Sequence, residues 1–231
     1  MKKFFVIDMM PFLYRGHFVF MRNPRITAGG FNTSALFGFA NSLLSILSTQ
    51  KPDCIAIAAE GRGRTFRHEI YPSYKAGRDK MPEDVAAAIP LAAELASILK
   101  IPVVSVDGVE ADDIIGTLSR LGAAAGLEVF MVTPDKDAAQ LVGPGVKLYR
   151  PGKGGDAPVT MGVEEVKAEW GLSCPAQMID YLALAGDAVD NVPGIRGIGS
   201  RTAQTLLAEY PDTEALIAAA PGVPGKLREK I

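Results

Sequence analysis

Seven acidic residues of this sequence lie just beyond four short, apolar, β-rich runs. If those runs are parallel strands of one sheet, their carboxyl-terminal ends meet at the edge where such sheets bind ligands. One acid alone could simply cap a helix, but seven carboxylates at close quarters repel one another and resist ionisation. Divalent cations relieve this repulsion, and an all-oxygen ligand set favours Mg²⁺ or Mn²⁺ over zinc. The candidate metal ligands are Asp8, Glu60, Glu110, Asp112, Asp113, Asp135 and Asp137.

The elements that must position these acids alternate between strand and helix. Predicted strands cover residues 4–7, 54–59, 103–106, 129–133 and 146–149, and predicted helices cover residues 33–47, 82–99 and 111–125. Such alternation implies βαβ crossovers. The sequence therefore predicts an α/β fold with a mostly parallel central sheet flanked by helices.

The character of the sequence changes near residue 150. Residues 151–160 form a connection rich in glycine and proline, and helical patterns follow at 163–170, 175–186 and 200–209. We therefore predict an α/β core over residues 1–150 and a helical region over residues 151–231.

The stretch GDAVDNVPGIRGIGSRTA adds two more acids, Asp187 and Asp190, followed by a glycine-rich turn between two helices. Glycines let backbone amides approach a phosphate closely, and such a turn grips duplex DNA without reading its sequence. A glycine-rich turn alone is usually only a helix connection, but its place after paired acids favours a helix–hairpin–helix element over residues 175–209. Its candidate DNA-binding residues are Gly194, Arg196, Gly197, Gly199, Ser200 and Arg201.

A basic, irregular segment at residues 61–80 is the other candidate for nucleic-acid binding. It holds six basic residues against two acids, with aromatic residues interleaved. It could be only a solvated loop, but this composition also suits phosphate neutralisation and base stacking. The residues concerned are Arg62, Arg64, Phe66, Arg67, Tyr71, Tyr74, Lys75, Arg78 and Lys80.

The overall composition excludes some classes of protein. With 231 residues, 48% of them hydrophobic, and a net charge of −2, the chain is neither disordered nor obviously basic. With the nine candidate ligands set aside, however, 17 acids remain against 24 basic residues. The net charge of the whole chain therefore averages an acidic cluster with a rest of the protein that is basic.

Several other functions and locations are excluded by missing motifs. Cys54 and Cys174 belong to no CxxC pattern, which predicts reduced thiols and neither a disulfide scaffold nor a zinc site. No P-loop, dinucleotide fingerprint or GxSxG motif occurs. The apolar start is interrupted at Asp8 and Arg15, and no apolar run approaches the ~20 residues needed to span a bilayer. We therefore expect a cytoplasmic protein that does not contact membranes.

Five motifs, in order along essentially the whole chain, resemble the 5′-nuclease (flap endonuclease) domain of bacterial DNA polymerase I. They are FVID…YR, TFRHEIYPSYKAGR, GVEADDIIGTL, TPDKDAAQLV and GDAVDNVPGIRGIGSRTA. The resemblance implies a PIN-like nuclease fold and hydrolysis of phosphodiester bonds in 5′ flaps, nicked duplexes or single-strand/duplex junctions. It also implies a monomer, with polymerase domains following if the sequence is a piece of a longer chain.

The resemblance assigns roles to individual residues. Two or more Mg²⁺ or Mn²⁺ ions are expected on the nine carboxylates, and a K⁺ ion at the hairpin. Tyr14 and Arg15 match a pair beside the site, and residues 61–85 match a helical arch around a single-stranded 5′ end. Lys75 and Arg78 are expected to face the scissile phosphate, with Arg67 and Tyr74 in the same arch.

Three departures from the family pattern leave two alternatives open. Glu60 stands where relatives usually carry Asp, Met9 and Met10 replace small residues, and the family domain normally continues beyond the length of this chain. An added methylene at Glu60 could displace its carboxylate by about 1 Å, which catalysis tolerates poorly. The alternatives are a catalytically weakened DNA-binding module and a PIN-type ribonuclease, although the latter does not explain the hairpin or the basic segment.

Overall fold

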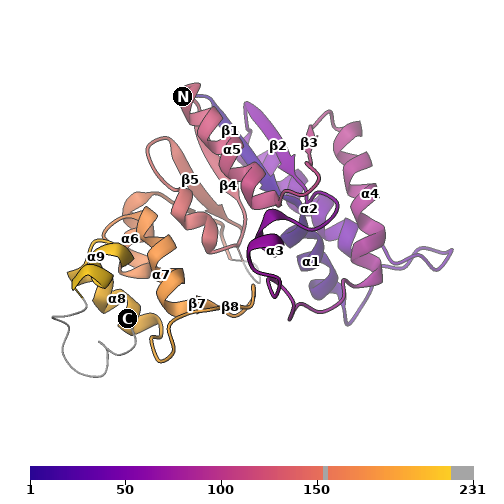
Figure 1. The fold of residues 1–231 in the computed structure, drawn as a ribbon. Helices are drawn as coiled ribbons and strands as arrows, with labels where there is room; N and C mark the ends of the chain where they lie inside the picture. Colours follow the sequence, from indigo (N-terminus) through magenta and orange to yellow (C-terminus); the bar gives the residue numbers. More distant parts are fainter. Residues whose placement is uncertain (153–155, 220–231) are drawn as a thin grey trace.

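A six-stranded sheet forms the centre of the molecule in the computed structural model, which describes residues 1–152 and 156–219 (Figure 1). Its strand order is β3-β2-β1-β4-β5-β6, with all neighbours parallel except β6, which runs antiparallel to β5. The strands are β1 (Lys3–Asp8), β2 (Cys54–Ala58), β3 (Val103–Val104), β4 (Glu128–Val132), β5 (Val146–Arg150) and β6 (Val159–Met161). The predicted parallel sheet is confirmed. β6 was not predicted, because its three residues follow a stretch rich in glycine and proline.

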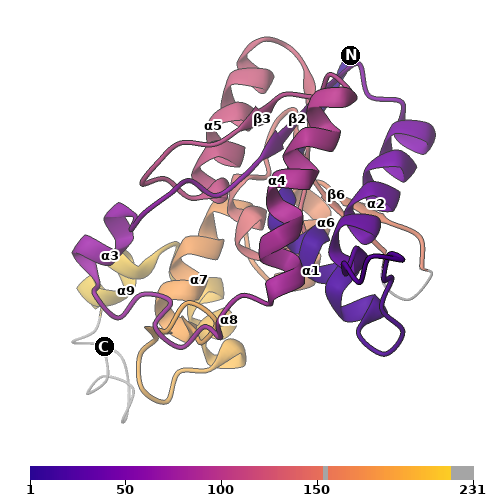
Figure 2. The ribbon, with the colours of Figure 1, turned by 90° about the vertical axis from the view of Figure 1, so that its right-hand side faces the viewer.

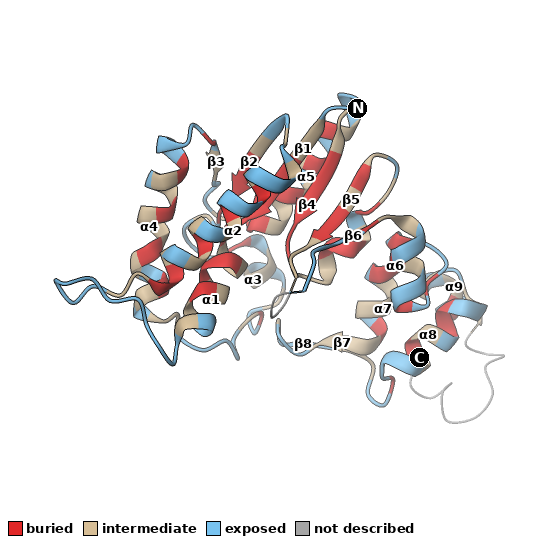
Figure 3. Cartoon of the chain, turned by 180° about the vertical axis from the view of Figure 1, so that it is seen from behind, coloured by how far each residue is buried: buried red, intermediate tan, exposed pale blue. Residues whose placement is uncertain are grey.

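Alternation of side chains along the strands divides the core into two layers. In β1, Phe5 and Ile7 pack on one face of the sheet, while Val6 packs on the other. Helices α1 (Met9–Phe20), α2 (Ser34–Gln50) and α4 (Glu83–Ile98) cover the first face, as Figure 2 shows. Helix α5 (Ala111–Ala124) covers the second face. Both faces of the central strands are therefore buried (Figure 3).

Helix α1 was not predicted from the sequence. Its Pro11 lies in the first turn, where a missing N–H costs little. Gly16 lowers its helix propensity but lets α1 approach α2 closely, because a Cβ on the facing Gly38 would overlap the Gly16 backbone. Packing against α2 thus decides the structure of a segment whose local sequence does not.

The C-terminal part of the chain is helical, as expected. It comprises α6 (Val163–Trp170), the 3₁₀ turn η2 (Pro175–Gln177), α7 (Met178–Ala185), the short strands β7 (Gly186–Asp187) and β8 (Val192–Pro193), α8 (Ser200–Glu209) and α9 (Thr213–Ala219). The buried Gln177 side chain donates to the carbonyl oxygens of Leu207 and Pro211, which joins the start of α7 to the end of α8. Apolar residues of these helices share one core with α5 and the sheet, so the two parts pack together.

The segment at residues 61–85, here called the arch segment, is largely irregular. It contains the short helix α3 (Phe66–Ile70), then turns up to residue 77, and it leads into α4. Pro72 and Gly77 oppose continuation of α3. Of the residues that the structure describes, no helix is long and apolar enough to cross a membrane.

A close approach of two glycines fixes the base of the β7–β8 hairpin and yields a stability prediction. A Cβ on Gly194 would overlap the backbone of Ala185 and Gly186. Overpacking typically costs about 1–3 kcal/mol, so Gly194→Ala is expected to lower the Tm by about 2–12 °C in a thermal melt. Gly143→Ala is the control, because nothing lies within 4 Å of its added Cβ. Equal melting temperatures of the two variants would contradict this account.

Candidate active site

The sheet topology places a carboxylate at the point where the strand order reverses. β1 lies between β2 and β4, and Asp8 is the last residue of β1. Its side chain is only 6% exposed and accepts a hydrogen bond from the Thr133 hydroxyl at 3.0 Å. Asp135 and Asp137 follow β4 beside it, as the strand-end argument predicts.

The N-terminus of α5 supplies three further carboxylates. Glu110 is the N-cap, and its N–H donates a hydrogen bond to the Asp113 carboxylate as part of a capping box. Asp112 lies in the same first turn. Capping therefore explains locally why these acids occur here, yet the buried Glu110 also accepts hydrogen bonds from three other side chains.

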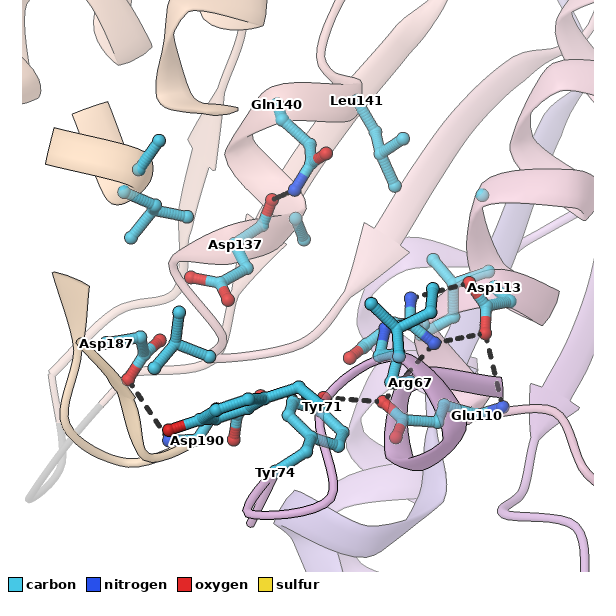
Figure 4. A pocket seen from close by; sticks show the side chains of 18 of the residues that line it. Arg67, Tyr71, Tyr74, Glu110, Asp113, Asp137, Gln140, Leu141, Asp187 and Asp190 are labelled. Carbon is cyan, nitrogen blue, oxygen red and sulfur yellow. Dashed lines mark hydrogen bonds and ion pairs between the residues drawn. The ribbon is translucent and has the colours of Figure 1, made fainter. Parts of the chain in front are cut away.

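The β7–β8 hairpin brings Asp187 and Asp190 to the same edge (Figure 4). The Asp187 carboxylate accepts the N–H groups of Val189 and Asp190, which shapes the turn. Lys136 donates to Asp137 at 2.8 Å and to Asp187 at 2.6 Å, which joins the α/β core to the helical part. Burial raises the pKa of Asp187, but these hydrogen bonds outweigh it and hold the pKa below its usual range.

Repulsion within the cluster is visible in the raised pKa values of three of its members. Burial and the charge of Asp112 are the main causes that raise the pKa of Asp8 to about 7. Burial and the charge of Asp135 are the leading causes that raise the pKa of Asp112 to about 7. Glu60 is exposed as a residue, yet partial burial of its carboxyl, opposed by the charge of Lys75, also raises its pKa. The carboxylates therefore act on one another electrostatically, as expected for an edge that attracts cations.

The arch segment delivers basic side chains onto these acids. Arg67 makes two hydrogen bonds to Asp113, at 2.7 and 2.8 Å, which hold the pKa of that carboxyl below its usual range. Lys75 Nζ lies 3.0 Å from Glu110 Oε2, and Arg78 donates to Asp190 at 2.6 Å.

The hydroxyl oxygen of Tyr74 lies between two acids from opposite sides of the site. It is 3.0 Å from Glu110 Oε2 and 2.8 Å from Asp190 Oδ2. Its single proton serves one of them at a time. Burial and the hydrogen bond to Asp190 raise the Tyr74 pKa, so the phenol stays protonated.

A pocket of about 960 Å³ opens beside these contacts. It is lined by Glu110, Asp112, Asp113, Asp137, Asp187 and Asp190, together with Arg67 and Tyr74. Six of the nine candidate ligands therefore share one cavity with residues of the arch segment. The remaining three are Asp8, Glu60 and Asp135, of which Asp8 lies deeper and Glu60 is exposed.

Other candidate residues lie outside this contact network. Tyr14 and Arg15 line a separate pocket of about 440 Å³ with Phe18, Pro134 and Pro151. Among the residues that the structure describes, neither side chain bonds to a candidate ligand. Several further candidates are exposed and free to meet a ligand from solution: Arg62, Arg64, Phe66, Arg196, Gly197, Gly199, Ser200 and Arg201.

The donor chemistry of the cluster fits a hard divalent cation, because every candidate ligand offers carboxylate oxygens. Within residues 1–152 and 156–219, no three acidic, histidine or cysteine side chains are arranged to hold one ion directly. Instead Lys75, Arg67 and Lys136 lie between the carboxylates as counter-charges.

Three residues of the site were missed by the sequence interpretation. Thr133 supports Asp8, Lys136 bridges two acids, and Asn191 donates to the Ser73 carbonyl. Lys136 could have been identified, since it stands between two candidate ligands in TPDKD. Asn191 carries no such signal, because its partner lies 118 residues away.

Comparison with known proteins identifies the family. Residues 3–171 match the model of the 5′–3′ exonuclease N-terminal resolvase-like domain, and residues 173–231 match that of the 5′–3′ exonuclease C-terminal SAM fold. A 5′–3′ exonuclease of Aquifex aeolicus is 36% identical over 94% of this chain and 73% of its own length. DNA polymerase I of Caldicellulosiruptor bescii is 36% identical over 99% of this chain. The chain spans only 27% of that polymerase.

Solved structures confirm the fold. The 5′-exonuclease of bacteriophage T5 with bound zinc superposes with a TM-score of 0.81 at 19% identity, covering 97% of this chain and 81% of that one. The catalytic core of Rad2 in complex with a DNA substrate gives a TM-score of 0.63 at 18% identity, covering 96% and 66%. On its match to both family models and to the Aquifex exonuclease, this chain belongs to the 5′–3′ exonuclease family.

Proposed function

We propose that this chain is a metal-dependent, structure-selective 5′ nuclease that hydrolyses DNA at 5′ flaps, nicks and single-strand/duplex junctions. The observation that carries the proposal is the docking of basic arch residues onto a carboxylate cluster at one sheet edge. That arrangement suits a phosphodiester bound between cations. The bound zinc of the T5 exonuclease and the DNA in the Rad2 complex support it.

We assign the carboxylates to two groups of metal ligands. Asp8, Glu60, Glu110, Asp112 and Asp113 would hold one Mg²⁺ or Mn²⁺ ion, and Asp135, Asp137, Asp187 and Asp190 would hold another. When bound, such ions stabilise charge on the phosphate and ease deprotonation of the attacking water. Besides burial, the charge of Asp112 raises the pKa of Asp8 and the charge of Asp135 raises the pKa of Asp112, so a nearby cation would favour their ionised forms.

The chain's own cations are the second part of the mechanism. The Lys75 ammonium is only 15% exposed, and low exposure strengthens its field at a phosphate. Lys75 and Arg78 would stabilise negative charge that develops during in-line attack, and the products would carry a 3′-hydroxyl and a 5′-phosphate. Arg67 orients Asp113, and Tyr14 and Arg15 would contact the strand near the site.

Duplex binding is assigned to the turn before α8. The backbone amides at the exposed Gly197 and Gly199, with Arg196 and Arg201, would grip phosphates, and a K⁺ ion would bind at this hairpin. The exposed Arg62, Arg64 and Phe66 would steer and stack the single-stranded 5′ end.

A cleavage assay tests the proposal and its main alternative. A DNA duplex with a labelled 5′ flap is expected to be cut in Mg²⁺ or Mn²⁺ and to remain intact in EDTA, as resolved on a denaturing gel. Binding without cleavage in either metal, under conditions where Glu60→Asp cuts, would overturn the proposal in favour of a weakened binding module. Faster cleavage of single-stranded RNA than of the flap would favour a PIN-type ribonuclease.

A further inference from the structure

The arch segment is tied to the turn between β7 and β8 by two hydrogen bonds, one between backbone groups and one from a side chain. The Lys75 N–H donates to the Asp190 carbonyl oxygen at 2.9 Å. The Asn191 side-chain amide donates to the Ser73 carbonyl oxygen at 2.7 Å. These two bonds flank Tyr74, whose hydroxyl meets the Asp190 carboxylate. A turn of the helical part thus fixes the path of the chain just before Lys75.

Backbone conformations at this junction show that tertiary contacts hold it. Lys75 and Asn191 both adopt a left-handed conformation with φ of +57°. Asn tolerates this region better than Lys does, so the conformation of Lys75 needs support from the contacts around it. The bond from the Lys75 N–H is one such constraint, and the Asn191 amide is the other.

No other group of the turn replaces the Asn191 side chain. The Ser73 carbonyl already accepts the Ala76 N–H at 3.1 Å, and the Asn191 amide takes its second lone pair. Asn191 is itself placed by Asp187, whose carboxylate accepts the N–H groups of Val189 and Asp190. A proposed metal ligand and the arch segment are therefore coupled through this turn.

The contact sets the position of the Lys75 ammonium. Lys75 Nζ lies 3.0 Å from Glu110 Oε2 and 5.0 Å from the centre of the Tyr74 ring. Lys75 follows Ser73 by two residues in the arch segment. A shift of this part of the segment would therefore carry the Lys75 ammonium away from the carboxylates. Displacements of about 1 Å can slow catalysis a hundredfold.

We infer that Asn191 is a positioning residue, whose side-chain amide holds the arch segment so that Lys75 faces the reaction centre. The kinetic consequence rests on the proposed nuclease function, whereas the contact itself does not. Two substitutions separate the amide from the backbone conformation. Asn191→Gly keeps the positive φ accessible but removes the amide. Asn191→Asp keeps the shape but replaces the donor with an acceptor.

Amide hydrogen exchange of the purified chain in EDTA, without DNA, tests the contact directly. Loss of one hydrogen bond is expected to speed exchange over residues 73–78 by about tenfold in both Asn191 variants. Val189→Ala is the matched control, since Val189 lies in the same turn with a side chain 67% exposed. Unchanged exchange in Asn191→Gly would overturn the inference, whatever the activity of the chain.

Single-turnover cleavage of a saturating 5′-flap duplex tests the consequence. Asn191→Gly is expected to slow cleavage by about 10–100-fold while the Kd for DNA changes by less than about threefold. In a Lys75→Ala background the same substitution is expected to have almost no further effect. An equal loss in that background would show a general structural role and overturn the inference. Absence of cleavage by the unaltered chain would refute the proposed function, and the exchange result would still decide the contact.

Discussion

Asp8→Asn is expected to slow cleavage of a 5′-flap duplex by at least about a thousandfold in single-turnover assays. Asp8 is one of the two buried members of the carboxylate cluster and lies at the end of the central strand β1. A bound metal typically contributes several kcal/mol to a hydrolytic transition state, and loss of a buried charged ligand forfeits much of it. Asn preserves the size of the side chain, and its amide oxygen can still accept the hydrogen bond that the Thr133 hydroxyl donates.

The same substitution is expected to leave the fold at least as stable in EDTA. Burial and repulsion from Asp112 oppose the charge on Asp8, so removing that charge relieves an unfavourable interaction. A rise of about 2–4 °C in Tm corresponds to each 1 kcal/mol gained in a chain of this size. Opposite changes in stability and activity are typical of residues retained for function.

Glu94→Gln is the matched control for loss of one acidic charge, because Glu94 lies exposed on α4. It is expected to change neither the cleavage rate nor the Tm appreciably. A large fall in the Tm of Asp8→Asn would mean that the Asp8 charge serves the fold. Cleavage within tenfold of the unaltered rate would remove Asp8 from the proposed metal site.

The sheet and the position of its acids could be predicted because both depend on local patterns. Strand β1 reads as an apolar run that ends in Asp8, and the parallel arrangement follows from helices between strands. Asp135 and Asp137 likewise fall at a strand end by spacing alone. Parallel topology then brings these acids to one edge of the sheet. Their clustering could therefore be predicted without predicting any contact between individual residues.

The features that the sequence did not predict depend on contacts between residues far apart in the chain. Helix α1 forms around the glycine contact with α2, which local propensity does not encode. The strand predicted over residues 103–106 is limited to the two residues of β3, because only Ile57 and Ala58 of β2 pair with it. The pairing of Arg67 with Asp113 depends on the path of the arch segment across 46 residues. Sequence patterns therefore predicted which charges gather at this edge of the sheet but not which of them contact one another.

Lys75→Ala is expected to slow single-turnover cleavage by about 100–1,000-fold, the usual cost of one preorganised electrostatic group. Its ammonium lies against the buried Glu110 and over the Tyr74 ring, where solvent screens it little. The Kd for flap DNA is expected to change by less than about threefold, since exposed arginines of the arch segment and hairpin remain. Lys2→Ala, at the opposite end of β1, is the control for loss of one positive charge.

Stability measured with and without metal distinguishes a role in catalysis from a role in charge balance. Removing Lys75 leaves Glu110, which is 3% exposed, with less compensating charge, so the Tm in EDTA should fall. Mg²⁺ should restore much of that Tm if the carboxylates bind it, because a bound cation takes over the compensation. The cleavage rate should nevertheless stay low, since metal ions would not replace the ammonium that we propose faces the phosphate. Recovery of both properties in Mg²⁺ would mean that Lys75 acts only as a counter-ion to Glu110.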